Sequence, residues 1–293
     1  MSNSDRATEQ AFDDKWGASW RGRSNAQHAL RMFHASFRLF PFAELRDGEG
    51  FDLGCGVGRH ARFVAPQVGK LHCIDPSPNA IAGARASMSA NMSGSGNVAF
   101  HLAGVDDIPL ADESQDFGYS MGVLHHIPDT EAGLGKCVDK LKPGAPFLLY
   151  LYYSFDNRPW WFRALWKVSD AARRRISRMP FRRKKRITDA IAILVYFPLS
   201  RAARLIARTG LGVEAFPLSF YRNTPLVNLK VSSLDRFGTN LERRFSKTEI
   251  EAMMRRVGLT EISFQDEAPY WIALGRKAPV GAREQAASPA PPR

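Results

Sequence analysis

The stretch Phe51-Asp-Leu-Gly-Cys-Gly-Val-Gly-Arg-His60 decides the fold of this 293-residue chain. It follows a short hydrophobic segment and precedes a stretch that we expect to be helical from Arg59 onward. Gly54, Gly56 and Gly58 let the backbone turn sharply and approach a ligand closely, and a helix beginning here would present free amide hydrogens. The G-x-G-x-x-G fingerprint of dinucleotide sites would need a glycine where Arg59 stands, and no Gly-Lys-Ser/Thr follows. The spacing therefore disfavours both NAD-type and Walker-type sites.

A second acidic signal lies nineteen residues after Gly56, where Asp75 ends an expected strand at 71–75. In a doubly wound fold this position brings a carboxylate to the carboxyl edge of the sheet, beside the glycine turn. There it can accept both hydroxyl hydrogens of a ribose. The alternative is an aspartate that only caps the turn before Pro76 and Ser77. The glycine turn at this distance favours ribose binding.

The rest of the chain alternates between strand and helix patterns. Expected strands lie at 71–75, 98–102, 117–121 and 146–152, and expected helices at 79–90 and 131–141. This rhythm predicts an α/β fold, a Rossmann-like, doubly wound and mostly parallel sheet. The rhythm breaks at residue 153 and resumes near Ser246, where a capping box starts the last core helix. A helical insert therefore separates the fifth strand from that helix.

These patterns divide the chain into five parts. We expect an N-terminal helical cap at 1–46, the first part of the core at 47–152, a basic helical insert or lid at 153–245, the C-terminal helix and strands of the core at 246–277, and a disordered Ala/Pro-rich tail at 278–293.

Three more blocks complete a pattern that resembles a known family: Asp106 to Leu110, Asp116-Phe117, and Met121 to Asp129. Together with the glycine turn and Asp75, they resemble the class I S-adenosylmethionine-dependent methyltransferases, in particular their small-molecule, methyltransferase-11-like branch. The resemblance covers residues 47–152 and, more weakly, 246–276. It implies an enzyme with S-adenosyl-L-methionine as its methyl donor.

The resemblance also implies roles for individual residues in donor binding. In that family the first glycine motif holds the amino-acid half of the donor, the acid that ends the second strand binds ribose, and the residues before an Ile/Leu-Pro pair hold adenine. On this chain these roles fall to Asp52, Gly54, Cys55 and Gly56 for the methionine end, Asp75 for ribose, Val105 and Asp106 for adenine, and Met121 near the sulfonium. Many relatives have Gly-Asp-Ala where this chain has Ala103-Gly104-Val105, so any carboxylate contact with the adenine amine falls to Asp106.

The acceptor is less well defined by the sequence. No Asn/Asp-Pro-Pro-Tyr block follows the fourth strand, which disfavours N-methylation of bases or glutamine. A hydroxyl acceptor needs a base, and His125 and His126 are the candidates, with His125 preferred as the nearer to the strand end. The alternative is that one imidazole only bonds backbone. Further candidates for the acceptor pocket are Tyr152, Tyr153, Tyr221 and Arg222. We expect O-methylation of a small molecule or of a glycan- or lipid-linked intermediate; the alternatives are RNA methylation and a non-catalytic donor-binding regulator.

Charge is segregated along the chain. The net charge is +12, and residues 157–208 carry fifteen Lys or Arg and two Asp, a local charge of +13, so the remainder sums to about −1. Three interpretations stay open for this segment: a lid with a solvated basic face, peripheral docking on an anionic membrane, or binding of a polyanion such as RNA.

Composition bounds the cellular setting. Three scattered cysteines form no CxxC pair or His/Cys cluster, so we expect neither a disulfide framework nor a metal site. The first thirty residues are polar, and we expect a cytoplasmic protein, with contact to the inner face of the membrane as an open possibility. The most apolar run, Ile187 to Leu199, has thirteen residues and includes Asp189, whereas a span needs about twenty apolar residues. The sequence therefore predicts no transmembrane helix.

Overall fold

A computed structural model describes residues 3–19, 26–91, 96–213 and 216–279. The backbone contacts divide the chain into two units. The core unit comprises Met1–Ser4, Phe33–Tyr153 and Arg243–Arg293, and the helical unit comprises Asp5–Met32 and Ser154–Glu242. The segment Asp5–Met32 thus belongs with the insert. The tail expected at 278–293 lies outside the described residues from residue 280 onward.

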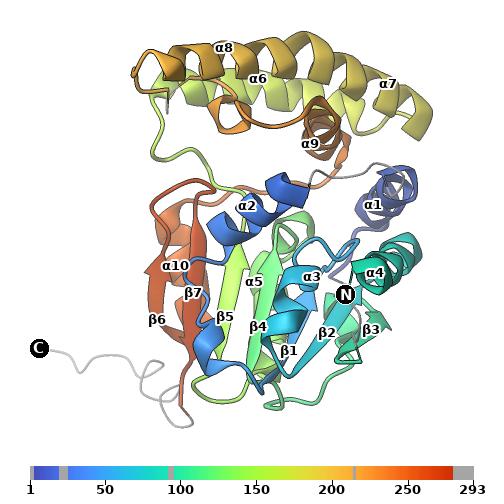
Figure 1. Ribbon diagram of the computed structural model, residues 1–293, viewed down its shortest axis with the longest axis vertical. Helices are drawn as coiled ribbons and strands as arrows, with labels where there is room; N and C mark the ends of the chain where they lie inside the picture. Colours follow the sequence, from blue (N-terminus) through green and yellow to red (C-terminus); the bar gives the residue numbers. More distant parts are fainter. Residues whose placement is uncertain (1–2, 20–25, 92–95, 214–215, 280–293) are drawn as a thin grey trace, which may run out of the picture. The chain divides into compact units, whose positions relative to one another are not determined.

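The core unit is built on a seven-stranded sheet with the order β3-β2-β1-β4-β5-β7-β6 (Figure 1). Its strands are β1 (Glu49–Leu53), β2 (Lys70–Asp75), β3 (Val98–Leu102), β4 (Phe117–Met121), β5 (Pro146–Tyr150), β6 (Leu259–Phe264) and β7 (Ile272–Lys277). The first five strands pair in parallel, and β7 pairs antiparallel with both β5 and β6. The predicted Rossmann-like, mostly parallel sheet is confirmed.

The strand order reverses beside β1. Asp52 in β1 pairs with Cys73 in β2 on one side and with Tyr119 in β4 on the other. The chain moves outward from β1 through β2 to β3, and then returns to the other side of β1 as β4. In open α/β sheets such a reversal leaves a crevice at the carboxyl ends of the strands, where ligands bind. The candidate donor residues lie in β1, at the ends of β2 and β4, or in the segments that follow β1 and β3.

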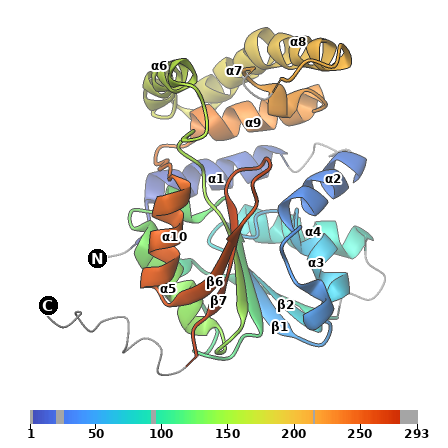
Figure 2. The same ribbon diagram turned by 90° about the vertical axis from the view of Figure 1, so that its left-hand side faces the viewer.

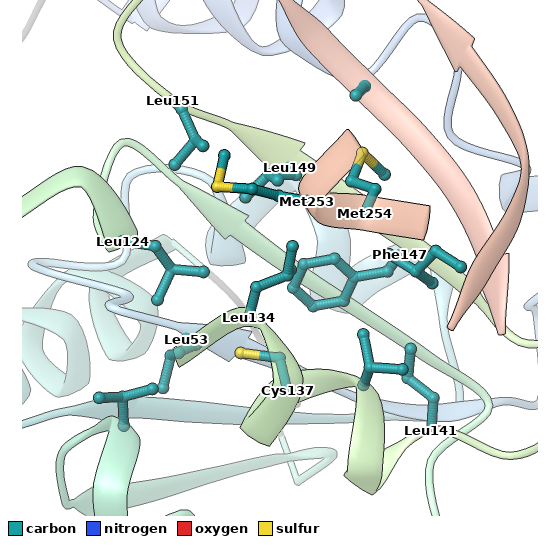
Figure 3. Packing of buried hydrophobic residues seen from close by; sticks show 14 of the residues in the cluster. Leu53, Leu124, Leu134, Cys137, Leu141, Phe147, Leu149, Leu151, Met253 and Met254 are labelled. Atoms are coloured by element: carbon teal, nitrogen blue, oxygen red, sulfur yellow. The ribbon is translucent and has the colours of Figure 1, made fainter. Parts of the chain in front are cut away.

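Helices cover both faces of the sheet, as Figure 2 shows. On one face are α3 (Ala61–Val64) and α4 (Pro78–Asn91), and on the other are α5 (Thr130–Lys140) and α10 (Lys247–Arg256). Leu134 and Cys137 of α5 and Met253 of α10 pack on Phe147 and other apolar residues of the strands (Figure 3). This continuous apolar core holds the strand ends in fixed positions.

Local signals set the ends of the helices, as the sequence indicated. Asp129 caps α5 by accepting a hydrogen bond from the Ala132 amide, and Ser246 and Glu249 form the predicted capping box of α10. Within the helical cap expected at 1–46, α2 spans Ala26–Ser36 and ends before Phe37. Phe37 and Phe40 instead follow as a turn, and both pack into the apolar cluster under β4.

The helical unit contains α1 (Arg6–Ser19), α6 (Trp160–Ile176), α7 (Phe181–Ile191), a π-helical segment (Ala192–Tyr196), α8 (Phe197–Arg208) and α9 (Leu226–Gly238). α9 packs against α1, α6, α7 and the π-helical segment. The small apolar core of the helical unit consists of Ile176, Tyr196, Leu229 and Phe237.

The segment from α7 to α8 is a longer helix than the sequence argument considered. Phe181–Arg208 is one continuous helix of 28 residues, and among the described residues it is the one helix long and apolar enough to cross a membrane by length and composition. An 18-residue window has a mean hydropathy of 1.6, and 22% of that window is buried. The sequence argument considered only the 13-residue run from Ile187 to Leu199, which contains Asp189 and Pro198. It missed the span-like helix because Pro198 lies within the first turn of α8 and the helix continues through it.

Candidate functional site

The glycine turn forms a tight loop at the end of β1. Gly54, Gly56 and Gly58 have φ angles of 76°, 54° and 74°, a region that side chains other than glycine rarely adopt. The loop is fixed to β2, because the amides of Gly54 and Cys55 donate to the Ile74 carbonyl over 2.8 and 3.1 Å. A Cβ on Gly54 would lie 2.3 Å from Cγ2 of Val123. The absence of a side chain at residue 54 is therefore a requirement of the fold.

The helix after this loop starts later than predicted. α3 has four residues and begins at Ala61, not at Arg59. A further turn separates it from the last glycine. The free amides expected from a helix N-terminus are not found in the glycine loop, because the amides of Gly54, Cys55, Gly56 and Gly58 all donate to oxygen atoms of the protein.

Asp75 joins the glycine loop to α4. One carboxylate oxygen, Oδ2, accepts a hydrogen bond from the Gly56 amide at 2.9 Å, and the other, Oδ1, accepts one from the Ser77 amide at 2.9 Å. The side chain is buried. The sequence offered ribose binding or turn capping as alternatives, and the structure shows the capping contact. Each carboxylate oxygen has a second lone pair, so both roles are compatible.

Asp52 lies buried in β1, beneath the loop. Burial raises the pKa of its carboxyl group to about 8; the Tyr119 hydroxyl lowers the pKa, and the charge of Asp75 raises it further. Two carboxyl groups thus share one apolar environment near the loop. A ligand with a positive charge would favour their ionised forms.

Cys55 and Met121 occupy packing positions around the same strand ends. The Cys55 thiol donates to the Gly56 carbonyl at 3.5 Å. Its pKa is raised well above the ordinary value, by a hydrogen bond with Cys73 and then by burial, so this thiol stays neutral and is not a nucleophile. Met121 ends β4 and is half-buried against the apolar cluster.

The predicted adenine residues lie in a short 3-10 helix after β3, Val105–Asp107. Val105 is buried in the core, whereas Asp106 is exposed. Oδ2 of Asp106 accepts a hydrogen bond from the backbone amide of Asn3 at 2.7 Å. The Asn3 side chain donates to the Asp129 carbonyl and accepts from the Asp129 backbone amide, each at 2.7 Å. Sequence reasoning missed Asn3 because nothing distinguishes one asparagine in a polar N-terminal segment.

The two histidines follow β4 in a 3-10 helix, Leu124–His126. His125 is fully buried and its ring stacks on Tyr152 at a centroid distance of 3.8 Å. Its Nδ1 accepts a hydrogen bond from the Tyr152 amide at 3.4 Å. The His125 pKa lies well below its ordinary value because of burial, and secondarily because of electrostatic interaction with His126 and Arg244. His125 is thus neutral, and its Nδ1 lone pair is already occupied by backbone.

Residues that return from the insert complete this cluster. The Arg243 amide donates to the His125 carbonyl at 3.0 Å. The Arg244 guanidinium lies 5.1 Å from the centroid of the Tyr152 ring and donates to the Tyr153 carbonyl at 3.2 Å. Neither arginine was a sequence candidate, because both lie over a hundred residues from the histidines in the chain. Of the further acceptor-pocket candidates, Tyr152 and Tyr153 lie in the core unit, and Tyr221 and Arg222 in the helical unit.

The described residues contain no group of three or more His, Cys, Asp or Glu side chains placed to hold a metal ion. The polar groups at the strand ends are instead two acids, a glycine loop and a pair of imidazoles. This arrangement fits an organic ligand that has both hydroxyl groups and a positive charge.

Comparison with protein families identifies the sheet and its site. Residues 51–149, which run from β1 to β5, match a family described as "Methyltransferase domain". Residues 51–149 therefore form a methyltransferase domain, for which S-adenosylmethionine is the cofactor. Its residues fit that cofactor: the tight glycine loop ends β1, and the buried acids Asp52 and Asp75 lie beside it.

Curated relatives match only part of this chain. Phosphoethanolamine N-methyltransferase 2 of Caenorhabditis elegans is 31% identical over 113 residues, which is 38% of this chain and 25% of the relative. Ubiquinone biosynthesis O-methyltransferase of Xanthomonas euvesicatoria is 30% identical over 139 residues, 46% of this chain and 54% of the relative. The chain therefore spans between a quarter and about half of the length of these relatives.

A solved structure has a similar fold. Magnesium protoporphyrin IX methyltransferase from Synechocystis, with bound SAH, is 13% identical and has a TM-score of 0.52, covering 90% of this chain and 94% of the other. At this identity the likeness concerns the fold of the methyltransferase domain and not its acceptor.

Proposed function

We propose that this protein transfers a methyl group from S-adenosylmethionine to an oxygen atom of a small molecule or of a glycan- or lipid-linked intermediate. The observation that carries the proposal is the placement of Asp52 and Asp75 about the glycine loop, with a histidine pair after the neighbouring strand. Three of the matched relatives are named as O-methyltransferases, which supports oxygen as the acceptor atom.

The donor end follows from the acids and the loop. The Asp75 oxygens have lone pairs for the two ribose hydroxyls, and the loop amides lie beside them. Asp52 is the acid for the ammonium group of the methionine end. Val105 and Asp106 form the adenine edge, and Asp106 must exchange its Asn3 contact to bond the adenine amine directly. When bound, the donor supplies an electrophilic methyl group on a cationic sulfur.

The pKa of Asp52 predicts a pH-dependent donor affinity. In the free protein this carboxyl group has a pKa of about 8, so it is protonated at neutral pH. A bound ammonium group favours the carboxylate, and donor binding therefore releases a proton below pH 8. We expect the affinity to rise by up to about tenfold from pH 6 to pH 7, and less steeply from pH 7 to pH 8. Isothermal titration calorimetry with S-adenosylmethionine, in buffers of different ionisation enthalpy, measures both the affinity and the released proton.

The matched control for this titration is Asp52→Asn, which has the same shape and no proton to lose. It should bind the donor more weakly, and its affinity should be flat between pH 6 and pH 7. A wild-type affinity that does not change over this range would exclude Asp52 as the linked group. Titration with NAD tests the cofactor itself: binding of NAD without binding of S-adenosylmethionine would overturn the proposed function.

On the acceptor side, we propose His126 as the general base. A hydroxyl is a poor nucleophile until its proton leaves, and an imidazole nitrogen takes the proton as the oxygen bonds to the methyl carbon. The sequence favoured His125, but its Nδ1 accepts a backbone amide and its ring is enclosed by Tyr152. His126 is its neighbour, with ring centroids 4.0 Å apart. His125 then serves to position the cluster.

The histidine proposal predicts separable effects of two substitutions. His126→Gln should lower the methyl-transfer rate by about 10²–10⁴-fold while leaving donor affinity unchanged. His125→Gln should lower the melting temperature, because it disturbs a buried, stacked ring. Labelled methyl transfer to a panel of phenols, catechols and carboxylic acids measures the rate, and exposed His34→Gln is the control. Full turnover by His126→Gln would remove this residue from the mechanism.

A further inference from the structure

The outer surface of the helical unit combines exposed apolar side chains with exposed cations. α6, α7 and α8 form a layer over α9 (Figure 2), and α9 packs on α6, α7 and the π-helical segment between α7 and α8. On the α6 part of this layer, Trp160 is 75% and Val168 71% exposed, and Trp161 and Leu165 are also exposed. On the α7–α8 part, the exposed apolar residues are Ile193, Leu194, Val195, Phe197 and Leu205. A soluble surface rarely exposes so many apolar side chains together.

These side chains recur at helical spacing. On α6, Trp161, Leu165, Val168 and Arg175 follow one another at intervals of four, three and seven residues. On the longer helix, the exposed positions are Arg182 and Arg186, then Ile193 and Phe197, then Arg204 and Arg208. Residues at such spacing share one face of a helix. The exposed face of Phe181–Arg208 is therefore apolar in the middle and cationic at both ends.

The basic residues of the insert divide into two groups. Lys184 donates to the Gly238 carbonyl at 3.0 Å, Arg173 donates to the Thr239 and Asn240 carbonyls at 2.9 Å, and Arg201 donates to the Arg222 and Thr224 carbonyls at 2.9 and 3.0 Å. These cations hold the helices together. Most of the other basic residues between 157 and 208 are exposed and supply the surface charge, namely Arg163, Lys167, Arg175, Arg178, Arg182, Arg183, Arg186, Arg204 and Arg208. Arg174 is also exposed but pairs with Asp170 at 3.0 Å.

We propose that this surface, formed by α6 and the α7–α8 helix, docks on an anionic lipid bilayer. Charge complementarity and the apolar stripes support this occupant together. Arginine attracts anionic headgroups, tryptophan prefers the membrane–water interface, and Leu, Val, Ile and Phe enter the acyl boundary. A nucleic acid would be attracted by the arginines but would not use the stripes of Val, Leu and Ile. The proposal goes beyond methyl transfer and does not depend on it.

The helix lies in the plane of the membrane and does not cross it. Its inner face carries Lys184, Thr188 and Ser200, all buried against the rest of the helical unit. The Lys184 ammonium is bonded to Gly238, and the Thr188 carbonyl accepts a hydrogen bond from Ser233 at 2.8 Å. A spanning orientation would remove these groups from their partners and place them in hydrocarbon, where an unsatisfied polar group is costly. Only the outer face is built for lipid.

The test is co-sedimentation of the full chain with vesicles in 0.1 M NaCl. We expect binding to vesicles of phosphatidylserine and phosphatidylcholine at 1:3, and little binding to phosphatidylcholine alone. The triple variant Arg182→Gln, Arg183→Gln, Arg186→Gln should weaken binding about 100-fold in total. The three charges contribute about equally to the attraction to an anionic surface. Lys184 is left intact in this variant because it is a structural residue.

A matched control removes the same charge from the core unit, through exposed Arg46→Gln, Lys136→Gln and Arg255→Gln. This control should bind like wild type. Trp160→Ser, Val168→Ser and Leu194→Ser combined should also release the protein, by about 10- to 100-fold, through lost apolar burial. Melting temperature and donor affinity, measured on each variant, should match those of wild type, which separates this proposal from the proposed function.

Several outcomes would overturn the proposal. They are wild-type protein that ignores anionic vesicles, a control variant that loses as much binding as the arginine variant, or a shift of structured RNA in a gel without vesicle binding. Washing with 1 M NaCl, where the Debye length falls to about 3 Å, should release the bound wild type. Retention through that wash and through alkaline carbonate would instead indicate a spanning helix.

Discussion

Asp75→Ala should weaken the binding of S-adenosylmethionine by about two to four orders of magnitude. Each hydrogen bond from a ribose hydroxyl to this carboxylate is charge-assisted and contributes about 1.5–3 kcal/mol. Two such bonds correspond to a loss of about 10²–10⁴-fold in affinity. The substitution also removes the acceptor of the Gly56 and Ser77 amides, so the loop loses its attachment to α4. Calorimetry on the purified variant measures the loss.

Two comparisons separate ribose recognition from loss of the loop. In Ser77→Ala the helix cap on the Ala80 amide is lost, at a cost of about 1 kcal/mol in stability, and donor affinity should be unchanged. A donor analogue without the 2′-hydroxyl should bind wild type more weakly than S-adenosylmethionine does, whereas Asp75→Ala should not distinguish the two ligands. If the analogue binds more weakly than S-adenosylmethionine by the same factor in both proteins, Asp75 holds the loop and does not bind the ribose hydroxyls.

The sheet could be predicted because its signals are local. The glycine turn, the buried run Pro146–Tyr150 and the capping box of α10 each depend on residues close together in sequence, and all three are found in the structure. The donor residues gather because carboxyl ends of parallel strands share one edge, which also follows from the alternating pattern.

The features that escaped prediction depend on contacts distant in sequence. Asn3 reaches Asp106 and Asp129, and Arg243 reaches His125, through folding that no local pattern encodes. The burial of His125 is decided by Tyr152, which arrives with the strand after the next helix. Without that ring, the two histidines look equivalent.

The cationic cluster 182–186 shows the same limit within the insert. In sequence its five members are alike, and a test of membrane binding would neutralise all of them. In the structure Lys184 points inward to the Gly238 carbonyl and Lys185 pairs with Asp189 at 2.8 Å, while Arg182, Arg183 and Arg186 are exposed. Helical spacing predicts that residues 182–186 point in different directions around the helix. Which of them are buried depends on the position of α9, against which α7 packs.

The largest effect on stability is expected at Gly54. Gly54→Ala places a side chain at a φ angle of 76°, which costs about 1–2 kcal/mol, and brings its Cβ to 2.3 Å from Val123, an overpacking that costs about 1–3 kcal/mol more. The free energy of unfolding should fall by about 2–5 kcal/mol. The melting temperature should fall by about 5–15 °C. Donor binding should be lost as the loop moves away from Asp75.

Two further variants separate backbone strain from the clash. Gly144 has a similar φ angle of 81°, and nothing lies within 4 Å of a Cβ built there, so Gly144→Ala should cost only the backbone contribution. Truncation of Val123 in the double variant Gly54→Ala, Val123→Ala should recover part of the overpacking cost relative to the sum of the single variants, because the methyl groups at 2.3 and 2.6 Å are gone and only the Cβ of residue 123, at 2.9 Å, stays close. Additive losses in this cycle would show that the φ angle alone makes glycine necessary at residue 54. Recovery of stability without recovery of donor binding would show that the loop must also keep its backbone conformation to hold the methionine end of the donor.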